Sequence, residues 1–233
     1  MFKGCYTALV TPMLEDGNID YSGLEELIDF QITNSCQGIL AAGTTGESPT
    51  LKWEEHNELI ERTCKQTVGR SLSIAGTGSN STHETVEASE HAVHAGADAL
   101  LLVDPYYNGP SSLEIRREYV EPVAAAFPGV QIIPYIIPGR TGCMMQVEDL
   151  AILADQYGNV ASVKEATGDL KNMAKTRRMC GNEFDILSGD DDMTVAMMKS
   201  TEINAQGVIS VASNVIPGPI QKLTELLSEG VLE

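Results

Sequence analysis

The sequence predicts an α/β protein, a (β/α)8 TIM barrel that forms a single domain over residues 1–233. Short runs rich in Val, Ile, Leu and Ala alternate without a break with longer segments of helical periodicity. Eight such runs recur at spacings of about 22 to 34 residues, the length of a βα unit. Hydrophobic residues make up 42% of the chain and charged residues 21%, which allows a large buried core.

Each predicted strand is a short apolar run, and each predicted helix shows an apolar stripe. The strands begin near Gly4, Gly38, Leu72, Ala99, Gln131, Val160, Phe184 and Gln206. The first two helices carry the stripes Leu24, Leu27, Ile28, Ile32 and Leu59, Ile60, Thr63, Cys64, and the other six span 82–95, 111–127, 146–156, 169–179, 193–200 and 216–227. A doubly wound open sheet is the main alternative, but Thr11-Pro12 follows the first strand where that fold has a glycine-rich turn.

Charge and segment composition exclude several classes of function. The chain has 15 basic and 33 acidic residues and a net charge of -18, which disfavours nucleic acid and anionic membranes as partners. No apolar run reaches the roughly 18 residues of a membrane span, and acidic residues come too early for a signal peptide. Five widely spaced cysteines without a CxxC pair indicate buried, reduced thiols. We therefore expect a soluble cytoplasmic protein.

Lys164 is the main candidate for chemistry, because in this fold the active site lies at the carboxyl ends of the strands. Strand alternation places Val160, Ser162 and Lys164 on one face. Burial lowers the pKa of a lysine and exposes a nucleophilic amine, as a Schiff-base enzyme requires. The alternative is a structural ion pair with Glu165 or with a carboxylate of residues 190–192.

Other polar residues at the strand ends extend this site. Tyr135 ends the strand before Lys164 and is suited to proton transfer, although a tyrosine that only fills the barrel is equally compatible. Thr44 and Thr45, between two glycines, offer hydroxyl and backbone N–H groups to a carboxylate, or form a simple capped turn. Arg140 offers a bidentate fork to a second carboxylate, or is a surface arginine.

The sequence predicts neither a metal nor a cofactor. His83, His91 and His94 lie on one predicted helix and His56 on another, and we expect all four at the helix surface, away from the strand ends. Residues 190–192 are three aspartates. They could bind magnesium, but we interpret them as a helix cap, which is the commoner role of aspartate before a helix. Their negative charge after the seventh strand also makes phosphorylated sugars poor substrate candidates.

Seven motifs resemble those of the dihydrodipicolinate synthases, also called 4-hydroxy-tetrahydrodipicolinate synthases, and span nearly the whole chain. They are GTTGES at 43–48, GTGSN at 76–80, DPYYN at 104–108, GRTG at 139–142, VKEATGD at 163–169, LSGDD at 187–191 and GVISVASN at 207–214. The resemblance implies a class I aldolase-like barrel of the N-acetylneuraminate lyase superfamily. Such enzymes condense pyruvate with aspartate semialdehyde on the way to lysine and diaminopimelate.

The resemblance also implies a role for each matching residue. Lys164 would form the imine with pyruvate, and Tyr135 would handle its protons. Thr44 would link Tyr135 to Tyr107 of a neighbouring subunit, which implies a homo-oligomer, a dimer or a tetramer. In the pocket Thr45 would hold the pyruvate carboxylate, Arg140 the semialdehyde carboxylate, and Gly189 and Ile209 would offer backbone groups.

A second set of residues matches the positions at which feedback-regulated members of the family bind L-lysine. These are Ser48, His56, Asn80, Glu84 and Tyr106, with Trp53 one helical turn before His56. Glu84 would meet the ligand ammonium group, and an aromatic side chain its aliphatic stem. The alternative is that these residues merely occupy two helix starts, with Glu84 facing the helix dipole.

Three departures from the family pattern leave other functions open. Ile136 follows Tyr135 where the family has asparagine, Pro134 removes one hydrogen-bond donor from the strand, and the chain lacks most of the usual C-terminal helical extension. They are compatible with a fragment, or with a variant of altered assembly or weakened activity. One alternative is another pyruvate-dependent aldolase, such as a 2-keto-3-deoxy sugar acid aldolase. Another is a catalytically weak homologue that binds pyruvate or lysine.

Overall fold

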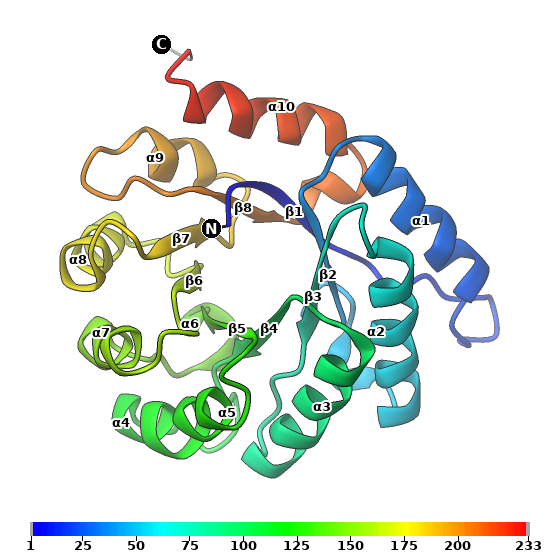
Figure 1. The fold of residues 1–233 in the computed structure, drawn as a ribbon, viewed down its shortest axis with the longest axis horizontal. Helices are drawn as coiled ribbons and strands as arrows, with labels where there is room; N and C mark the ends of the chain where they lie inside the picture. The colour runs from blue at the N-terminus through cyan, green and yellow to red at the C-terminus, as the bar shows by residue number, and fades with distance from the viewer. Residues whose placement is uncertain (1, 232–233) are drawn as a thin grey trace.

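The computed structural model describes residues 2–231, which form a closed barrel of eight parallel strands in the order β1 to β8, with β8 paired to β1 (Figure 1). The strands are β1 Gly4–Ala8, β2 Gly38–Ala41, β3 Leu72–Gly76, β4 Ala99–Val103, β5 Gln131–Ile136, β6 Ser162–Glu165, β7 Asp185–Ser188 and β8 Gly207–Ser210. This confirms the predicted (β/α)8 TIM barrel, which places the carboxyl ends of all strands at one face.

The helices form a ring outside the strands (Figure 1). They are α1 Tyr21–Thr33, α2 Trp53–Thr67, α3 Thr82–Ala95, α4 Ser112–Glu114, α5 Glu121–Ala126, α6 Pro138–Thr141, α7 Val147–Gln156, α8 Leu170–Cys180, α9 Thr194–Lys199 and α10 Pro217–Ser228. Three further short helices are η1 Ser48–Thr50, η2 Ile115–Val120 and η3 Ala212–Asn214. Of these, η2 is π-helical and joins α4 to α5.

The structure corrects the predicted boundaries at a few places. The helix predicted over 111–127 is present but contains the π-helical segment η2. Helix α6 lies where only a loop was expected. Strand β6 begins at Ser162, after the predicted start, because Val160 packs in the cluster between the sheet and the helices and precedes the alternating part of the strand.

Two hydrophobic layers hold the barrel together. The inner layer fills the barrel with side chains such as Tyr6, Leu40, Leu101, Leu187 and Ile209. The larger outer layer packs the helices on the sheet. Full burial of one such side chain contributes roughly 1.5–3 kcal/mol to the free energy of unfolding. These layers keep the strands, and hence the strand ends that carry polar groups, in a fixed arrangement.

Pro134 does not interrupt β5. It pairs in register with Leu102 of β4, and the next residue, Tyr135, pairs with Val103. The strand continues to Ile136, so its backbone accommodates the lost N–H donor. Tyr135 is therefore held in the sheet despite the preceding proline.

The barrel closes where β1 meets β8. Gly4 pairs with Gly207, and a Cβ atom on Gly207 would overlap the Gly4 carbonyl group, so this seam requires glycine. Side chains also join distant parts of the chain here. The Ser213 hydroxyl donates to Thr7 Oγ1 at 2.9 Å, and the Gln31 amide donates to the Ser213 carbonyl at 3.0 Å.

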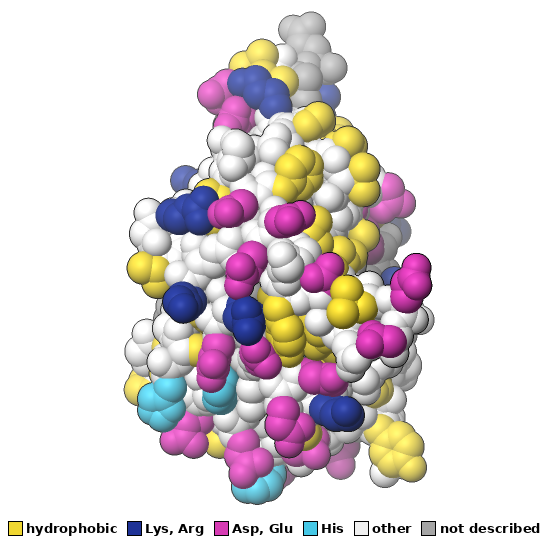
Figure 2. Space-filling view, turned by 90° about the vertical axis from the view of Figure 1, so that its right-hand side faces the viewer, with side chains coloured by type: hydrophobic (Ala, Val, Ile, Leu, Met, Phe, Trp, Pro, Cys, Tyr) yellow, Lys and Arg dark blue, Asp and Glu magenta, His cyan; other side chains and the backbone are white. Residues whose placement is uncertain are grey.

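The surface charge agrees with the net charge of -18, and three of the five thiols are buried as the sequence predicted. Acidic side chains are spread over the face that carries α1 to α3, with fewer basic ones between them (Figure 2). Within residues 2–231, every helix is too short or too polar to cross a bilayer. The five thiols are free, and Cys5, Cys36 and Cys64 are buried as expected, whereas Cys143 and Cys180 are partly exposed.

Candidate active site

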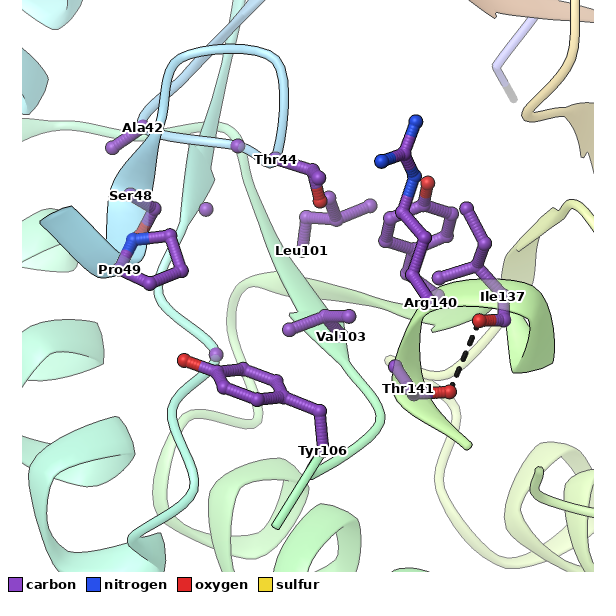
Figure 3. Close-up of a pocket in the computed structure, with 14 residues that line it drawn as sticks. Ala42, Thr44, Ser48, Pro49, Leu101, Val103, Tyr106, Ile137, Arg140 and Thr141 are labelled. Carbon is purple, nitrogen blue, oxygen red and sulfur yellow. Dashed lines mark hydrogen bonds between the residues drawn. The ribbon is translucent and has the colours of Figure 1, made fainter. Parts of the chain in front are cut away.

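A cavity of about 260 Å³ opens at the carboxyl ends of strands β2 to β5. Its walls are Ala42, Gly43, Thr44, Ser48, Pro49, Gly76, Gly78, Leu101, Val103, Tyr106, Tyr135, Ile137, Arg140 and Thr141. Figure 3 shows Thr44 and Arg140 at one end of this cavity and Tyr106 at the other, near Pro49. Three of the residues predicted for catalysis or substrate binding, Thr44, Tyr135 and Arg140, therefore line one cavity.

Lys164 lies inside the barrel next to this cavity. Its side chain is 4% exposed, and its Nζ lies 4.1 Å from the centroid of the Tyr135 ring. Within residues 2–231, no carboxylate forms an ion pair with Nζ. The alternative interpretation of Lys164 as one half of a structural ion pair is therefore wrong for the described residues. Burial lowers the pKa of Lys164 to about 7, against smaller opposing effects of Asp190 and Asp191. A large fraction of the amine is consequently neutral and nucleophilic near neutral pH.

Gly189 and Ile209 complete the surroundings of the lysine. A Cβ atom on Gly189 would lie 2.8 Å from Ala166 Cβ and 3.3 Å from Lys164 Cε, so a side chain there would overlap Ala166 and press against the lysine. Ile209 is fully buried in the inner layer on β8. Neither residue lines the cavity: Gly189 is half-buried and follows the end of β7, whereas Ile209 is buried on β8.

Tyr135 occupies the position expected of an acid/base. It pairs in register with Lys164 and is 3% exposed. Burial raises the pKa of its phenol to about 12, while Arg140 and the nearby Thr44 side chain act in the opposite direction. The phenol is therefore protonated at neutral pH, and it can donate a proton to an oxygen that leaves near Lys164.

The loop after β2 presents both threonines in different ways. Backbone hydrogen bonds from Glu47 N to the Thr44 carbonyl (3.1 Å) and from Ser48 N to the Gly43 carbonyl (3.3 Å) fold this loop tightly. Thr44 is exposed and lines the cavity, whereas Thr45 is half-buried and does not line it. The loop places one of the two predicted hydroxyl groups at the cavity wall.

Arg140 sits on the short helix α6, directly after Tyr135 and β5. Its backbone N–H donates to the Ile137 carbonyl at 3.0 Å, which forms the first turn of α6. The side chain is exposed and lies at the mouth of the cavity (Figure 3). A guanidinium group there can bind a carboxylate at the cavity entrance.

Tyr107 is not part of this site within one chain. Its side chain is 71% exposed and does not line the cavity, whereas the adjacent Tyr106 is 40% exposed and lines it. A single copy of the chain therefore does not bring Tyr107 together with Thr44 and Tyr135.

A second cavity of about 240 Å³ lies beside the first and shares Tyr106 and Ser48 with it. All six residues of the second predicted set line it: Ser48, Trp53, His56, Asn80, Glu84 and Tyr106. Asn80 Oδ1 accepts a hydrogen bond from Tyr106 N at 2.7 Å, and Glu84 Oε2 accepts one from the Ser79 hydroxyl at 2.6 Å. The residues from α2, α3 and the loop after β4 thus form one pocket.

His56 corrects the expectation that all four histidines lie at the helix surface. It is 2% exposed, and its Nε2 hydrogen-bonds to the Gly76 carbonyl at 2.9 Å, so Nε2 carries the proton. Burial lowers the pKa of His56, which keeps the ring neutral at neutral pH. The Trp53 ring meets it edge-on at 5.0 Å between centroids.

The aspartates after β7 serve the backbone. Asp191 accepts hydrogen bonds from the Ser210 hydroxyl at 2.5 Å, from Val211 N at 3.0 Å and from Ala212 N at 2.9 Å. It therefore caps the short helix η3 after β8, whereas the sequence predicted a cap for the helix that follows β7. Among residues 2–231 no cluster of three or more His, Cys, Asp or Glu side chains is arranged to hold a metal ion.

Two buried carboxyl groups were not predicted to belong to the site. Asp104 and Glu165 are 1% and 0% exposed and lie behind Tyr135 and Lys164. Both residues stand next to a predicted site residue or strand end in the sequence. The sequence did contain a signal for them, because each is an acidic residue in or next to an apolar run. Unpaired acids are rarely buried, so such a position indicates a special role.

The fold and the site define a class: (β/α)8 barrel enzymes that carry a buried lysine near a strand end. The sequence profile of the Dihydrodipicolinate synthetase family matches residues 1–233, and the chain belongs to that family. It is 45% identical over 233 residues to the 4-hydroxy-tetrahydrodipicolinate synthase of Geobacter sulfurreducens, covering 100% of this chain and 78% of that protein.

Solved structures agree with this assignment. The dihydrodipicolinate synthase of Aquifex aeolicus has a TM-score of 0.94 and 42% sequence identity, over 99% of this chain and 76% of that one. The enzyme of Cyanidioschyzon merolae with lysine bound has a TM-score of 0.92 and 38% identity, over 99% of this chain and 78% of that one.

Proposed function

We propose that this protein is a 4-hydroxy-tetrahydrodipicolinate synthase, a lyase that condenses pyruvate with L-aspartate 4-semialdehyde. The observation that carries the proposal is the buried Lys164 amine, free of any ion pair within residues 2–231, beside the Tyr135 ring at the cavity. Relatives of this name at 45% identity support the choice of substrates.

The chemistry begins with the neutral Lys164 amine, which attacks the ketone carbon of pyruvate to form a C–N bond. Tyr135 donates its proton to the resulting hydroxyl group, which leaves as water and gives the imine. The Tyr135 phenolate left by this step takes a proton from the methyl group, which yields an enamine. The enamine carbon attacks the aldehyde carbon of the second substrate, and Tyr135 gives the proton to the aldehyde oxygen, which becomes a hydroxyl group. The amino group of that substrate then attacks the imine carbon, closes the ring and releases Lys164.

The carboxylates of the two substrates require separate partners. We assign the pyruvate carboxylate to the hydroxyl and backbone N–H groups of Thr44 and Thr45, in the tight loop after β2. We assign the semialdehyde carboxylate to Arg140 at the cavity mouth. Backbone groups of Gly189 and Ile209 would line the inner end, next to Lys164.

Tyr107 enters the proposal through a neighbouring subunit. Because its side chain is 71% exposed and lies outside its own cavity, we propose that it reaches the Thr44–Tyr135 pair of a second copy. The active form would then be a homo-oligomer, a dimer or a tetramer, in which the Tyr107 side chain of a neighbouring subunit completes each active site.

Mass spectrometry after incubation with pyruvate and borohydride tests the proposed reaction class. One pyruvate adduct per chain, located at Lys164, is the expected result, since borohydride reduces the imine to a stable amine. Absence of an adduct would favour a catalytically silent pyruvate or lysine binder. Turnover of aspartate semialdehyde, measured against 2-keto-3-deoxy sugar acid cleavage, separates the synthase from the alternative aldolase.

Replacing Arg140 with alanine should raise the KM for aspartate semialdehyde at least about tenfold while pyruvate labelling persists. The guanidinium group contributes a bidentate bond to the second carboxylate alone. Steady-state kinetics with each substrate varied in turn measures the effect, and Arg178→Ala on the exposed face of α8 is the matched control. An equal loss for both substrates would contradict the assignment.

We also propose that the second cavity binds L-lysine and regulates the enzyme. Glu84, within the cavity, would meet an ammonium group of the ligand, and the edge of Trp53 its aliphatic stem. Tyr106 lines both cavities, so a ligand that moves this side chain also changes the wall of the catalytic cavity. A relative solved with lysine bound supports this proposal.

Calorimetry should detect L-lysine binding to the assembled oligomer, and Glu84→Ala should abolish it without changing pyruvate labelling. The variant removes the carboxylate that faces the ligand ammonium group. Glu90→Ala, at an exposed position of the same helix, is the control and should bind lysine normally. If lysine at millimolar concentration neither binds nor inhibits, the residues merely occupy two helix starts.

A further inference from the structure

Two carboxyl groups behind the catalytic wall are buried without a cation. Met145 N donates to Asp104 Oδ2 at 3.0 Å, and Thr167 N donates to Glu165 Oε1 at 2.8 Å. The other oxygen of each group, Asp104 Oδ1 and Glu165 Oε2, is buried and has no hydrogen-bond partner among residues 2–231. Neither carboxyl group forms an ion pair with a described basic side chain.

The sheet register places the two acids in one row. Val103 pairs with Tyr135 and Tyr135 with Lys164; one residue further on, Ile136 pairs with Glu165. Asp104 directly follows Val103, and its N–H donates to the Tyr135 carbonyl at 3.2 Å. Successive side chains alternate across a strand, so this row lies on the outer side of the barrel wall that carries Tyr135 and Lys164 inside.

Ile136, between the two acids in the row, has no polar atom to offer either of them. It belongs to the hydrophobic layer between the sheet and the helices. An ionised carboxylate in such surroundings, without a counter-ion or a full set of hydrogen bonds, is strongly disfavoured and the group keeps its proton instead. The free oxygen of each acid is where that proton can reside.

The electrostatic surroundings act in the same direction. Burial raises the pKa of Asp104 to about 7, and the charge of Glu165 adds to this effect. Burial likewise raises the pKa of Glu165 to about 7, against the hydrogen bonds from Thr167. The titratable groups that face the pair are Tyr119 of η2, Cys143 between α6 and α7, Asp169 after β6 and Asp190 after β7, with Lys164 on the opposite side of β6.

Both acids are tied to segments that carry the site. Asp104 holds the backbone of Met145, at the end of the segment that begins with α6 and Arg140. Glu165 follows Lys164 directly, and its carbonyl accepts a hydrogen bond at 2.8 Å from the N–H of Gly189, where a Cβ atom would lie 3.3 Å from Lys164 Cε. Through these hydrogen bonds, Asp104 contacts the segment that carries Arg140, and Glu165 contacts the strand end that carries Lys164.

We propose that Asp104 and Glu165 are a proton-holding pair of positioning residues, which keep the Arg140 segment and the Lys164 end of β6 in place. When the carboxyl O–H bonds break and the protons pass to solvent at higher pH, the two charges repel, draw in water and displace both segments. The effect on turnover rests on the proposed function, whereas the protonated state of the pair does not.

The sign of the pH effect on stability follows from the raised pKa values. From the usual carboxyl values of 3.8 and 4.5 up to about 7, the folded chain binds protons that the unfolded chain has lost. The free energy of unfolding should therefore fall as the pH rises through this window and level off above it. Lys164, whose pKa is lowered from 10.5 to about 7, acts in the opposite direction and only above neutral pH.

Infrared spectroscopy and thermal melts of the wild type, Asp104→Asn and Glu165→Gln test the protonated state. At about pH 6 the wild type should show the carbonyl band of protonated carboxyl groups, reduced in each variant, because an amide imitates the neutral acid. The fall of Tm with pH should be shallower in both variants, and unchanged in the exposed controls Asp155→Asn and Glu183→Gln. No such band in the wild type at that pH overturns the proposal, even where a variant fails to fold.

Turnover tests the positioning role. The ratio of variant to wild-type turnover should rise about tenfold between about pH 6 and about pH 8, because only the wild type ionises the pair and displaces its binding groups. The titration of Lys164 affects both proteins equally and cancels in the ratio. A constant ratio overturns the positioning role. Failure of the proposed reaction would show instead as a missing pyruvate adduct in the wild type, with the carboxyl band intact.

Discussion

Replacing Lys164 with alanine should abolish the borohydride-trapped pyruvate adduct and lower turnover by at least about 10³-fold, the scale seen when a covalent nucleophile is removed. The amine is buried within the barrel and reacts only because burial lowers its pKa to about 7. Mass spectrometry of the trapped protein and steady-state kinetics measure the two effects. Wild-type labelling should also accelerate as the pH rises toward about 7, where the amine loses its proton.

The fold should survive this substitution, since the variant removes a side chain that makes no ion pair within the described part of the chain. Circular dichroism and a thermal melt check this point. Lys171→Ala, exposed at the start of α8, is the matched control and should label fully. An adduct on any other lysine, or full labelling of Lys164→Ala, would refute the proposed mechanism.

Replacing Tyr135 with phenylalanine should lower turnover by about 10² to 10⁴, the usual contribution of a general acid/base. The ring would remain in the inner layer, so we expect little change in Tm. Stopped-flow measurement of imine formation should show the same loss, because the hydroxyl group of the adduct can leave as water only after it accepts a proton. Tyr157→Phe, at a half-buried position after α7, controls for the removal of a hydroxyl group alone.

A smaller outcome has a distinct meaning. If Tyr135→Phe loses less than about tenfold in turnover, the phenol contributes little to proton transfer. Tyr135 would then be one of the tyrosines that fill the barrel, and the cation–π contact with Lys164 at 4.1 Å would be its main role.

Most of the fold could be predicted because strand and helix periodicities alternate clearly along the chain. Strands β1 to β5 begin at the predicted residues, and a turn or bend precedes the apolar run of each of β2 to β5. Strand β6 begins later than predicted. Val160 resembled the first residue of the strand because it is apolar, but it packs in the outer layer before the strand begins. The π-helical segment η2 and the short helix α6 leave no periodic pattern of their own, so sequence alone could not locate them.

The site was partly predictable for the same reason. Strand alternation put Lys164 on one face of its strand, and Tyr135 was predicted at the end of the strand before it, but neither pattern carries information on which loops converge. Burial of His56, on helix α2, depends on the carbonyl group of Gly76, which belongs to strand β3. The row of Asp104 and Glu165 depends on inter-strand register, which appears only when the barrel has closed.

The seam between β1 and β8 has a consequence for biosynthesis. Its paired glycines, Gly4 and Gly207, are separated by almost the whole described chain, so the ribosome must deliver the last strand before the first can find its second neighbour. Until then β1 presents an open edge to other nascent chains, and such edges are prone to aggregate. Contacts this distant in sequence also make folding slow. Chaperone demand during translation should therefore be greatest just before residues 207–210 emerge.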